Sequence, residues 1–190
     1  MFQQPLTRSA RRLFEVWRKN LPAPAYQRLR LSGAIHVLDG DIEKPNLGLT
    51  HEQVWDLQSK VNFIIHSASS INLRAKLSKL MSPIVEATLT MANIALGCAK
   101  LEHFVYISTA FANSHFHDPK KVQEVVIDER VYPLKTSDHG GTQEELAEAL
   151  KTGQVPEAHN FPFAYAYAKH LTERLLFDLF EHHPVSTIQL

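Results

Sequence analysis

The chain has 190 residues, enough to bury the core of one domain or of a large part of a bigger one. Its 20 basic and 20 acidic residues cancel, and neither sign forms a long run, which argues against binding to nucleic acid or to an anionic membrane surface. The single cysteine, Cys98, excludes an intrachain disulfide and fits an intracellular, reducing compartment. It lies in an apolar run, so we expect it to be buried. No apolar stretch is long enough to cross a bilayer.

The N-terminal segment admits two interpretations. Residues 1–12 are rich in arginine and free of acidic residues, a bias shared with mitochondrial transit peptides. The residues that follow continue this stretch as an ordinary amphipathic helix, and we favour that interpretation, with a helix over residues 8–19. Two prolines, Pro22 and Pro24, end it. A second short helix is expected over residues 26–31.

The rest of the chain alternates between apolar runs and helical patterns. The runs predict strands over residues 34–38, 61–65, 103–107 and 185–190. The main helices are expected over residues 51–59, with Thr50 as the cap, and over 84–100, 142–151 and 164–182. Strands that alternate with helices indicate βαβ units, hence an α/β fold with a Rossmann-like, doubly wound parallel sheet and helices on both faces.

A tyrosine and a lysine lie four residues apart in Tyr165-Ala-Tyr-Ala-Lys169, inside the last expected helix. Residues at i and i+4 share one face of a helix, so the two side chains can serve one site. A free tyrosine titrates near pH ~10, and a nearby ammonium ion favours its phenolate, which would suit Tyr165 to acid–base work. Tyr167 lies two residues from Lys169 and faces elsewhere. Because this spacing is common by chance, the pair alone fits equally well with aromatic residues that simply pack a helix.

Two hydroxyl side chains, Ser108 and Thr109, follow the expected strand over 103–107. In short-chain dehydrogenase/reductases a Ser or Thr follows the fifth strand, and the catalytic tyrosine and lysine lie on the next long helix. The chain resembles this superfamily in both order and spacing. The resemblance implies Thr109 first, with Ser108 close behind, as the hydroxyl that hydrogen-bonds a substrate carbonyl. A plain capping role for these hydroxyls is the alternative.

Two further strand ends carry candidate cofactor contacts. Asp41 and Ile42 follow the first expected strand and resemble the acidic turn that contacts adenine in extended members of the superfamily. The second expected strand leads into His66, Ser67 and Ala68, which match a small-residue turn that lets the backbone approach a dinucleotide. Each is ordinary turn chemistry when taken singly. Both, however, fall at the carboxyl ends of strands, where ligands bind in open α/β sheets.

Longer stretches resemble one branch of the superfamily, the fatty acyl-CoA reductases, also called male-sterility proteins. These stretches are residues 40–41, 45–49, 61–68 and 104–110, together with the more particular motif Asp-Glu-Arg-Val-Tyr-Pro over 128–133. The resemblance runs from about residue 8 to the end. It implies NADPH-dependent reduction of a long-chain fatty acyl-CoA thioester to an aldehyde and usually on to a primary alcohol. Lys169 would also hold the nicotinamide ribose.

The chain departs from the family pattern at both ends. It contains no glycine-rich loop of the G-x-x-G-x-x-G kind, and we expect the first two strands of the sheet to be missing, so that residues 1–190 form a partial NAD(P)-binding reductase domain. Nothing follows the last strand, where the family keeps its acyl-binding portion. Ile84 occupies the helix position where related enzymes often carry an active-site asparagine, unless the alignment shifts by one residue. We therefore expect the chain alone to be inactive, to bind NADPH negligibly and to aggregate or partly unfold.

Several alternatives stay open. A carrier-protein thioester reductase or a sugar-modifying relative would use the same catalytic pair, and a non-catalytic fragment or binding module is the alternative outside enzymes. His115 and His117 have no further ligands at zinc-like spacing, so no metal is expected and both are taken as solvent-exposed. The resemblance implies a cytoplasmic location, or one on an organelle membrane in a longer protein. These patterns imply nothing about oligomeric state.

Overall fold

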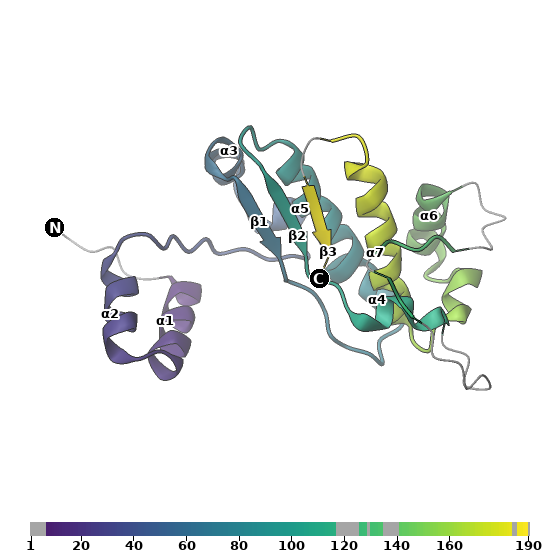
Figure 1. The fold of residues 1–190 in the computed structure, drawn as a ribbon, viewed down its shortest axis with the longest axis horizontal. Helices are drawn as coiled ribbons and strands as arrows, with labels where there is room; N and C mark the ends of the chain where they lie inside the picture. The colour runs from purple at the N-terminus through teal and green to yellow at the C-terminus, as the bar shows by residue number, and fades with distance from the viewer. Residues whose placement is uncertain (1–6, 117–125, 129, 135–140, 184–185, 190) are drawn as a thin grey trace. The chain divides into compact units, whose positions relative to one another are not determined.

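The computed structural model describes residues 7–116, 126–128, 130–134, 141–183 and 186–189. The chain divides into two compact units, Met1–Asp41 and Ile42–Leu190. Two helices, α1 (Arg8–Asn20) and α2 (Ala23–Leu31), make up the first unit (Figure 1). Both were predicted. Thr7 begins α1, because its hydroxyl accepts a hydrogen bond from the Ala10 N–H at 3.2 Å.

The strand predicted over residues 34–38 is not formed, and this prediction was wrong. The backbone there is irregular, and Ile35 and Leu38 are exposed. A strand needs a neighbour that accepts and donates its backbone hydrogen bonds. Among the described residues no other strand pairs with this segment. The apolar pattern alone is therefore not enough to make it a strand.

A three-stranded parallel sheet lies at the centre of the second unit. Its strands are β1 (Phe63–His66), β2 (His103–Tyr106) and β3 (Ser186–Gln189), in the order β1-β2-β3. The register aligns Phe63 with His103, and His103 with Ser186. β2 and β3 fall within predicted runs and β1 extends one residue beyond its run, and the parallel pairing confirms the predicted class of sheet.

The helices of the second unit follow the predicted pattern with two differences. They are α3 (His51–Lys60), α4 (Leu77–Leu80), α5 (Ala87–Leu96), α6 (Thr142–Thr152) and α7 (Ala164–Phe180). The helix predicted over residues 84–100 begins earlier, since α4 runs into α5 through a π-helical turn, Met81–Glu86, and it also ends earlier, at Leu96. Short 3₁₀ helices at Pro45–Gly48, Ala110–Phe116 and Pro156–Asn160 were not predicted as helices. None of the helices in the described part of the chain is long and apolar enough to cross a membrane.

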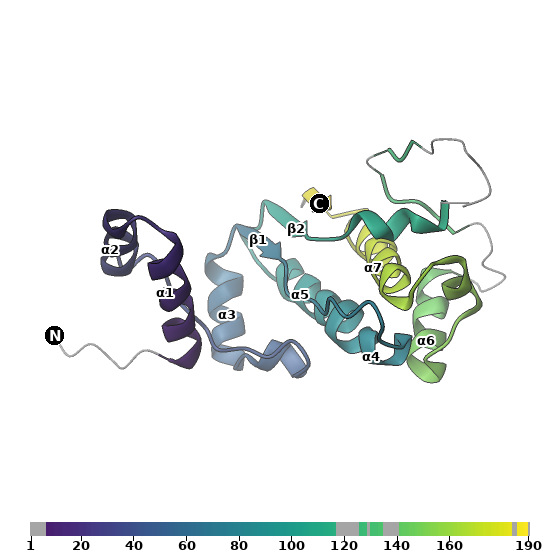
Figure 2. The same ribbon diagram turned by 90° about the horizontal axis from the view of Figure 1, so that it is seen from below.

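One face of the sheet is covered by α5 and α7, as Figures 1 and 2 show. Phe104 and Tyr106 point to this face, and the Phe104 ring stacks on Phe180 with the centroids 5.3 Å apart. Side chains alternate along a strand, so Phe63 and Ile65 point the other way. They are 48% and 62% exposed. The sheet is therefore well packed on the face that carries α7.

Leu47 joins the loop before α3 to the core through an unusual backbone. Its φ is 57° and that of Asn46 is 51°, a left-handed conformation that costs of order 1–3 kcal/mol for a residue such as leucine. The side chain is buried against Ala87 and Ile94 of α5, and burying a leucine contributes about 1.5–3 kcal/mol. The packing thus offsets the strain. The motif over residues 45–49 serves to place Leu47 against α5.

A buried ion pair fastens α6 to α7. The Arg174 Nη2 atom donates to both carboxylate oxygens of Glu145, at 2.7 and 2.6 Å. The Tyr167 hydroxyl donates to the same carboxylate at 2.7 Å. Glu145 and Tyr167 have no exposed surface. Tyr167 therefore stabilises the contact between α6 and α7, as expected of a tyrosine that faces away from Lys169.

Candidate active site

One face of α7 carries three polar side chains at four-residue intervals, Tyr165, Lys169 and Glu173. The alanines between and beside them favour the helix, and Ala166 and Ala168 are buried in the main core. All three side chains are buried, with exposed fractions of 7%, 2% and 6%. Polar groups that are buried to this extent need partners. The partners of Lys169 and Glu173 lie at the end of β2.

The residues after β2 are tied to this face of α7 by two hydrogen bonds. The Lys169 Nζ atom donates to the Ile107 carbonyl at 2.9 Å, and the Ser108 hydroxyl donates to Glu173 Oε1. Thr109 is the next residue and is half-buried. Its hydroxyl oxygen accepts the Phe111 N–H at 3.3 Å, which leaves the hydroxyl hydrogen for another partner. The structure thus brings the predicted hydroxyl of Ser108 to the predicted helix, and Thr109 follows it directly in the chain.

A stack of side chains lies beneath this arrangement. The Lys169 Nζ atom is 4.7 Å from the centroid of the Tyr106 ring, and the His66 ring lies nearly parallel to Tyr106 at 6.3 Å. His66 Nε2 is 3.1 Å from the Thr88 hydroxyl, which itself donates to the Ile84 carbonyl. Since a hydroxyl has one hydrogen to donate, His66 must be the donor, through Nε2–H. The imidazole is therefore in the Nε2–H tautomer, with its side chain in the core.

Burial dominates the electrostatics of the site. Desolvation lowers the pKa of Lys169 to about 8, and the nearby Glu173 carboxylate opposes this shift. Burial and then the Lys169 charge lower the pKa of His66 to about 4. Burial also raises the pKa of Glu173, against the Ser108 hydrogen bond and the Lys169 charge. At neutral pH the site therefore holds an ammonium ion and a neutral imidazole.

The predicted cofactor contacts occupy different environments. Ser67 and Ala68 are exposed at the carboxyl end of β1, as a small-residue turn should be. The His66 side chain is buried, and the His66 carbonyl accepts the Ile107 N–H at 3.0 Å, so the backbone of His66 bonds to the chain that continues β2. Ile42 packs against the cluster around Leu47. Asp41 is exposed, at the end of the first unit.

Sequence reasoning did not identify Glu173, Tyr106 or the role of the His66 ring in the site. For Glu173 a signal was present, because it continues the four-residue spacing of Tyr165 and Lys169. Tyr106 and His66 lie on neighbouring strands, and only the register of β1 with β2 brings them together. Ile84 lies in the π-helical turn and is fully buried in the main core.

The motif over residues 128–133 closes a loop through Tyr132. The Asp128 N–H donates to the Tyr132 hydroxyl at 2.8 Å, and the Arg130 guanidinium lies 4.6 Å from the ring centroid. Tyr132 is buried. Glu129, the second residue of the motif, lies outside the described residues.

The expectation that His115 is solvent-exposed was wrong. The 3₁₀ helix after β2 turns it inward, where its ring packs 4.9 Å from Phe161 and 4.8 Å from His170. His117 lies outside the described residues. No group of three His, Cys, Asp or Glu side chains that could hold a metal ion occurs in the part of the chain that the structure describes. Cys98 is buried, as predicted.

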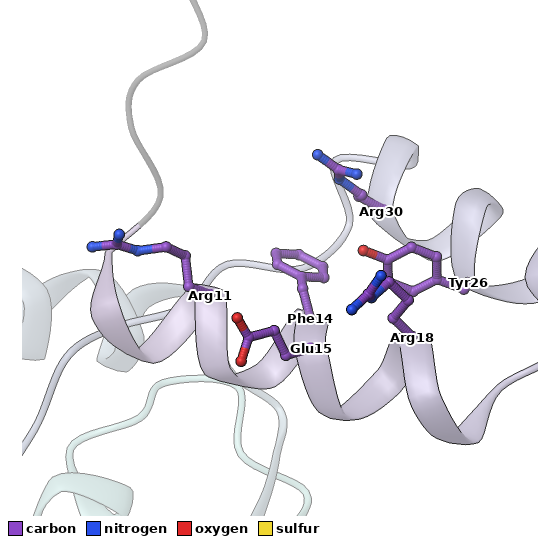
Figure 3. Close-up of a pocket in the computed structure, with 6 residues that line it drawn as sticks. All are labelled: Arg11, Phe14, Glu15, Arg18, Tyr26 and Arg30. Atoms are coloured by element: carbon purple, nitrogen blue, oxygen red, sulfur yellow. The ribbon is translucent and has the colours of Figure 1, made fainter.

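The first unit holds a pocket of about 160 Å³ between α1 and α2 (Figure 3). It is lined by three arginines, two aromatic residues and one glutamate: Arg11, Phe14, Glu15, Arg18, Tyr26 and Arg30. None of these is a predicted site residue. The pocket belongs to the first unit, whereas Tyr165, Lys169 and Glu173 belong to the second.

Comparison with known proteins identifies the family to which this chain belongs. The family model described as "Male sterility protein", a model of NAD-binding domains, matches residues 5–190. The chain belongs to the male-sterility, or fatty acyl-CoA reductase, family. This is a family of oxidoreductases within the extended short-chain dehydrogenase/reductases, so the predicted family is confirmed.

Individual relatives agree with this assignment. Fatty acyl-CoA reductase 2 of Bos taurus is 30% identical over 140 residues, which cover 73% of this chain and 26% of the relative. Fatty acyl-CoA reductase wat of Drosophila melanogaster is 26% identical over 157 residues, which cover 80% of this chain and 28% of the relative. The chain thus spans about a quarter of the length of the curated relatives that it matches.

A solved structure shares the fold. It is the terminal R domain from the myxalamid PKS-NRPS biosynthetic pathway, with a TM-score of 0.65 and 18% sequence identity. The match covers 96% of this chain and 40% of that chain. The predicted α/β, Rossmann-like class is confirmed by this likeness together with the parallel sheet.

Proposed function

We propose that this protein uses NADPH to reduce the thioester of a long-chain fatty acyl-CoA to the aldehyde and on to the primary alcohol. The observation that carries the proposal is the hydrogen bond from Lys169 Nζ to the Ile107 carbonyl, which holds the end of β2 against the helix face that bears Tyr165. This bond supports a site in which Thr109, two residues after Ile107, works together with Tyr165 and Lys169. The names of the relatives supply the substrate class.

Each side chain then has a distinct role. Tyr165 donates a proton to the carbonyl oxygen as the carbonyl carbon is reduced. The Thr109 hydroxyl donates a hydrogen bond to the same oxygen and stabilises the charge that develops there. Lys169 carries three N–H donors, of which Ile107 takes one, so others are free for the phenolate and for a ribose hydroxyl. Its positive charge stabilises the phenolate that Tyr165 leaves behind.

The first reduction yields a hemithioacetal. When its C–S bond breaks, the sulfur leaves as the thiol of coenzyme A and the carbon becomes an aldehyde. The aldehyde carbonyl can then occupy the same position between Tyr165 and Thr109. A second reduction by the same groups gives the alcohol.

The residues present fit the nicotinamide end of the cofactor. The side chains of Ser67 and Ala68 are small and exposed at the carboxyl end of β1, which leaves the backbone open to a dinucleotide. Lys169 can hydrogen-bond the ribose. The 190 residues contain no glycine-rich loop to hold the pyrophosphate. When bound, the cofactor supplies the hydride.

The test is reduction by the full protein that contains this chain. Purified protein is mixed with NADPH and a long-chain acyl-CoA, cofactor oxidation is followed by absorbance, and the products are identified by mass spectrometry. NADH serves as the control for cofactor choice. We expect NADPH consumption with formation of aldehyde and alcohol. Turnover of nucleotide sugars with none of acyl thioesters would contradict the assignment.

A second candidate is reduction of an acyl thioester held on a carrier protein. It is favoured by the fold shared with the terminal R domain from a PKS-NRPS pathway. The same acyl chain is offered on coenzyme A and on a phosphopantetheinylated carrier protein. A rate that is higher with the carrier protein by tenfold or more, about 1.4 kcal/mol in transition-state binding, would favour this candidate.

A further inference from the structure

The strongest unassigned feature of the site is the carboxylate of Glu173. It is 6% exposed and accepts the Ser108 hydroxyl, one turn of helix beyond Lys169. A buried carboxylate costs several kcal/mol of desolvation, and an apolar residue at such a position is often as stable or more so. Packing alone therefore does not account for an acid at this position. Its placement next to the catalytic lysine suggests a role in the chemistry.

Glu173 also separates the two hydroxyls at the end of β2. Ser108 has one hydroxyl hydrogen, and it is used in the bond to Glu173. The Thr109 hydroxyl oxygen accepts a hydrogen bond from the Phe111 N–H, and the Thr109 hydroxyl hydrogen is available for another acceptor. Thr109 is thus the residue that can donate to a substrate carbonyl. Ser108 is the residue that fixes the direction of the chain just before it.

The surroundings of Lys169 explain why it needs a counter-charge. The groups that face it from the elements packed around it are Tyr165 and Glu173 of α7, His66 of β1, Tyr106 of β2, and the Ile107 carbonyl with Ser108 after β2. Among these groups Glu173 is the acid. Tyr106 contributes a ring face, and the neutral His66 contributes no charge.

We propose that Glu173 is a positioning residue of the active site, which anchors Ser108 so that Thr109 faces the substrate and which supplies the counter-charge for the Lys169 ammonium ion. The proposal rests on the proposed function for the identity of the reaction. The burial that lowers the pKa of Lys169 is opposed by Glu173, which agrees with this role. Without the carboxylate, the lysine would lose its proton at a lower pH.

The experiment compares Glu173→Gln, Glu173→Asp and Asp178→Asn in the full protein that contains this chain. Asp178 is exposed on the same helix, so its variant is the matched control for a charge removed from α7. The first readout needs no activity: the rate of Lys169 acetylation by acetic anhydride is measured against pH by peptide mass spectrometry. The second readout is the pH profile of kcat/KM for acyl-CoA reduction.

In the wild type we expect the midpoint of Lys169 acetylation at a pH of about 8. Glu173→Gln should lower that midpoint, and the alkaline limb of kcat/KM, by about 1 pH unit or more. Glu173→Asp keeps the charge and should restore both toward the wild type, while Asp178→Asn should change neither. The same Lys169 midpoint in wild type and Glu173→Gln would overturn the proposal.

A second pair of variants tests which of the two hydroxyls donates to the substrate. Thr109→Ala should lower kcat/KM far more than Ser108→Ala, because only Thr109 donates to the substrate. Losses that are as large for Ser108→Ala would overturn the assignment of the two hydroxyls. If the wild type reduces no acyl thioester, the proposed function fails, whereas the acetylation profile still decides the role of Glu173.

Discussion

The two tyrosines of α7 should give opposite results when each is changed to phenylalanine. Tyr165 lies on the face of Lys169, whereas the Tyr167 hydroxyl donates to the buried Glu145 carboxylate at 2.7 Å. A hydrogen bond to a buried charge contributes about 1.5–3 kcal/mol to stability. General acid catalysis is worth roughly 10²–10⁴-fold in rate. Tyr165→Phe should therefore lose turnover and keep stability, and Tyr167→Phe should do the reverse.

Two measurements on the full protein separate these effects. Turnover is measured as kcat for acyl-CoA reduction, and stability is measured by urea unfolding of each variant. NADPH affinity, which should be similar in both variants and the wild type, is the control that the cofactor site is intact. Tyr167→Phe should lower the free energy of unfolding by about 1.5–3 kcal/mol, the contribution of its hydrogen bond to Glu145. The loss should not be larger, because Arg174 still pairs with the Glu145 carboxylate. Equal losses of turnover in both variants would refute the choice of Tyr165.

Three further predictions concern a buried ion pair, a buried histidine and the binding of NADPH by the isolated chain. Arg174→Met leaves Glu145 buried without its cation and should lower the free energy of unfolding by about 3–5 kcal/mol, measured in urea. The pKa of His66 is about 4 instead of 6.5, so the stability it contributes is complete above pH 6.5 and is lost as the pH falls toward 4. Between pH 7 and 5 the wild type should thus lose about 2 kcal/mol more than His66→Gln. The 190-residue chain alone, with no glycine-rich loop and with Phe63 and Ile65 exposed, should show no saturable NADPH binding in calorimetric titration; micromolar binding by a monomer would contradict this.

Local patterns were sufficient for most of the elements. The apolar runs at 61–65 and 103–107 became β1 and β2, because continuous apolar strands are stable when they pair within a parallel sheet. Thr50 begins α3 through a capping box with Gln53, as its position predicted. The spacing of Tyr165 and Lys169 determined that they share a face of α7. The cap and the spacing depend on neighbours within about one helical turn, and the apolar runs are visible in the sequence itself, so these features could be predicted without the tertiary structure.

The remaining features depend on partners that are distant in the sequence. Residues 34–38 have a strand pattern but no pairing strand among the described residues, and they remain irregular. His115 is polar and follows a strand, yet a 3₁₀ helix places it against Phe161. Above all, only the packing of α7 on the end of β2 decided that Ser108 is held by Glu173 and that Thr109 keeps its hydrogen. A hydrogen bond between residues 65 positions apart is set by the tertiary fold, because no local periodicity specifies which of two adjacent hydroxyls will meet the helix.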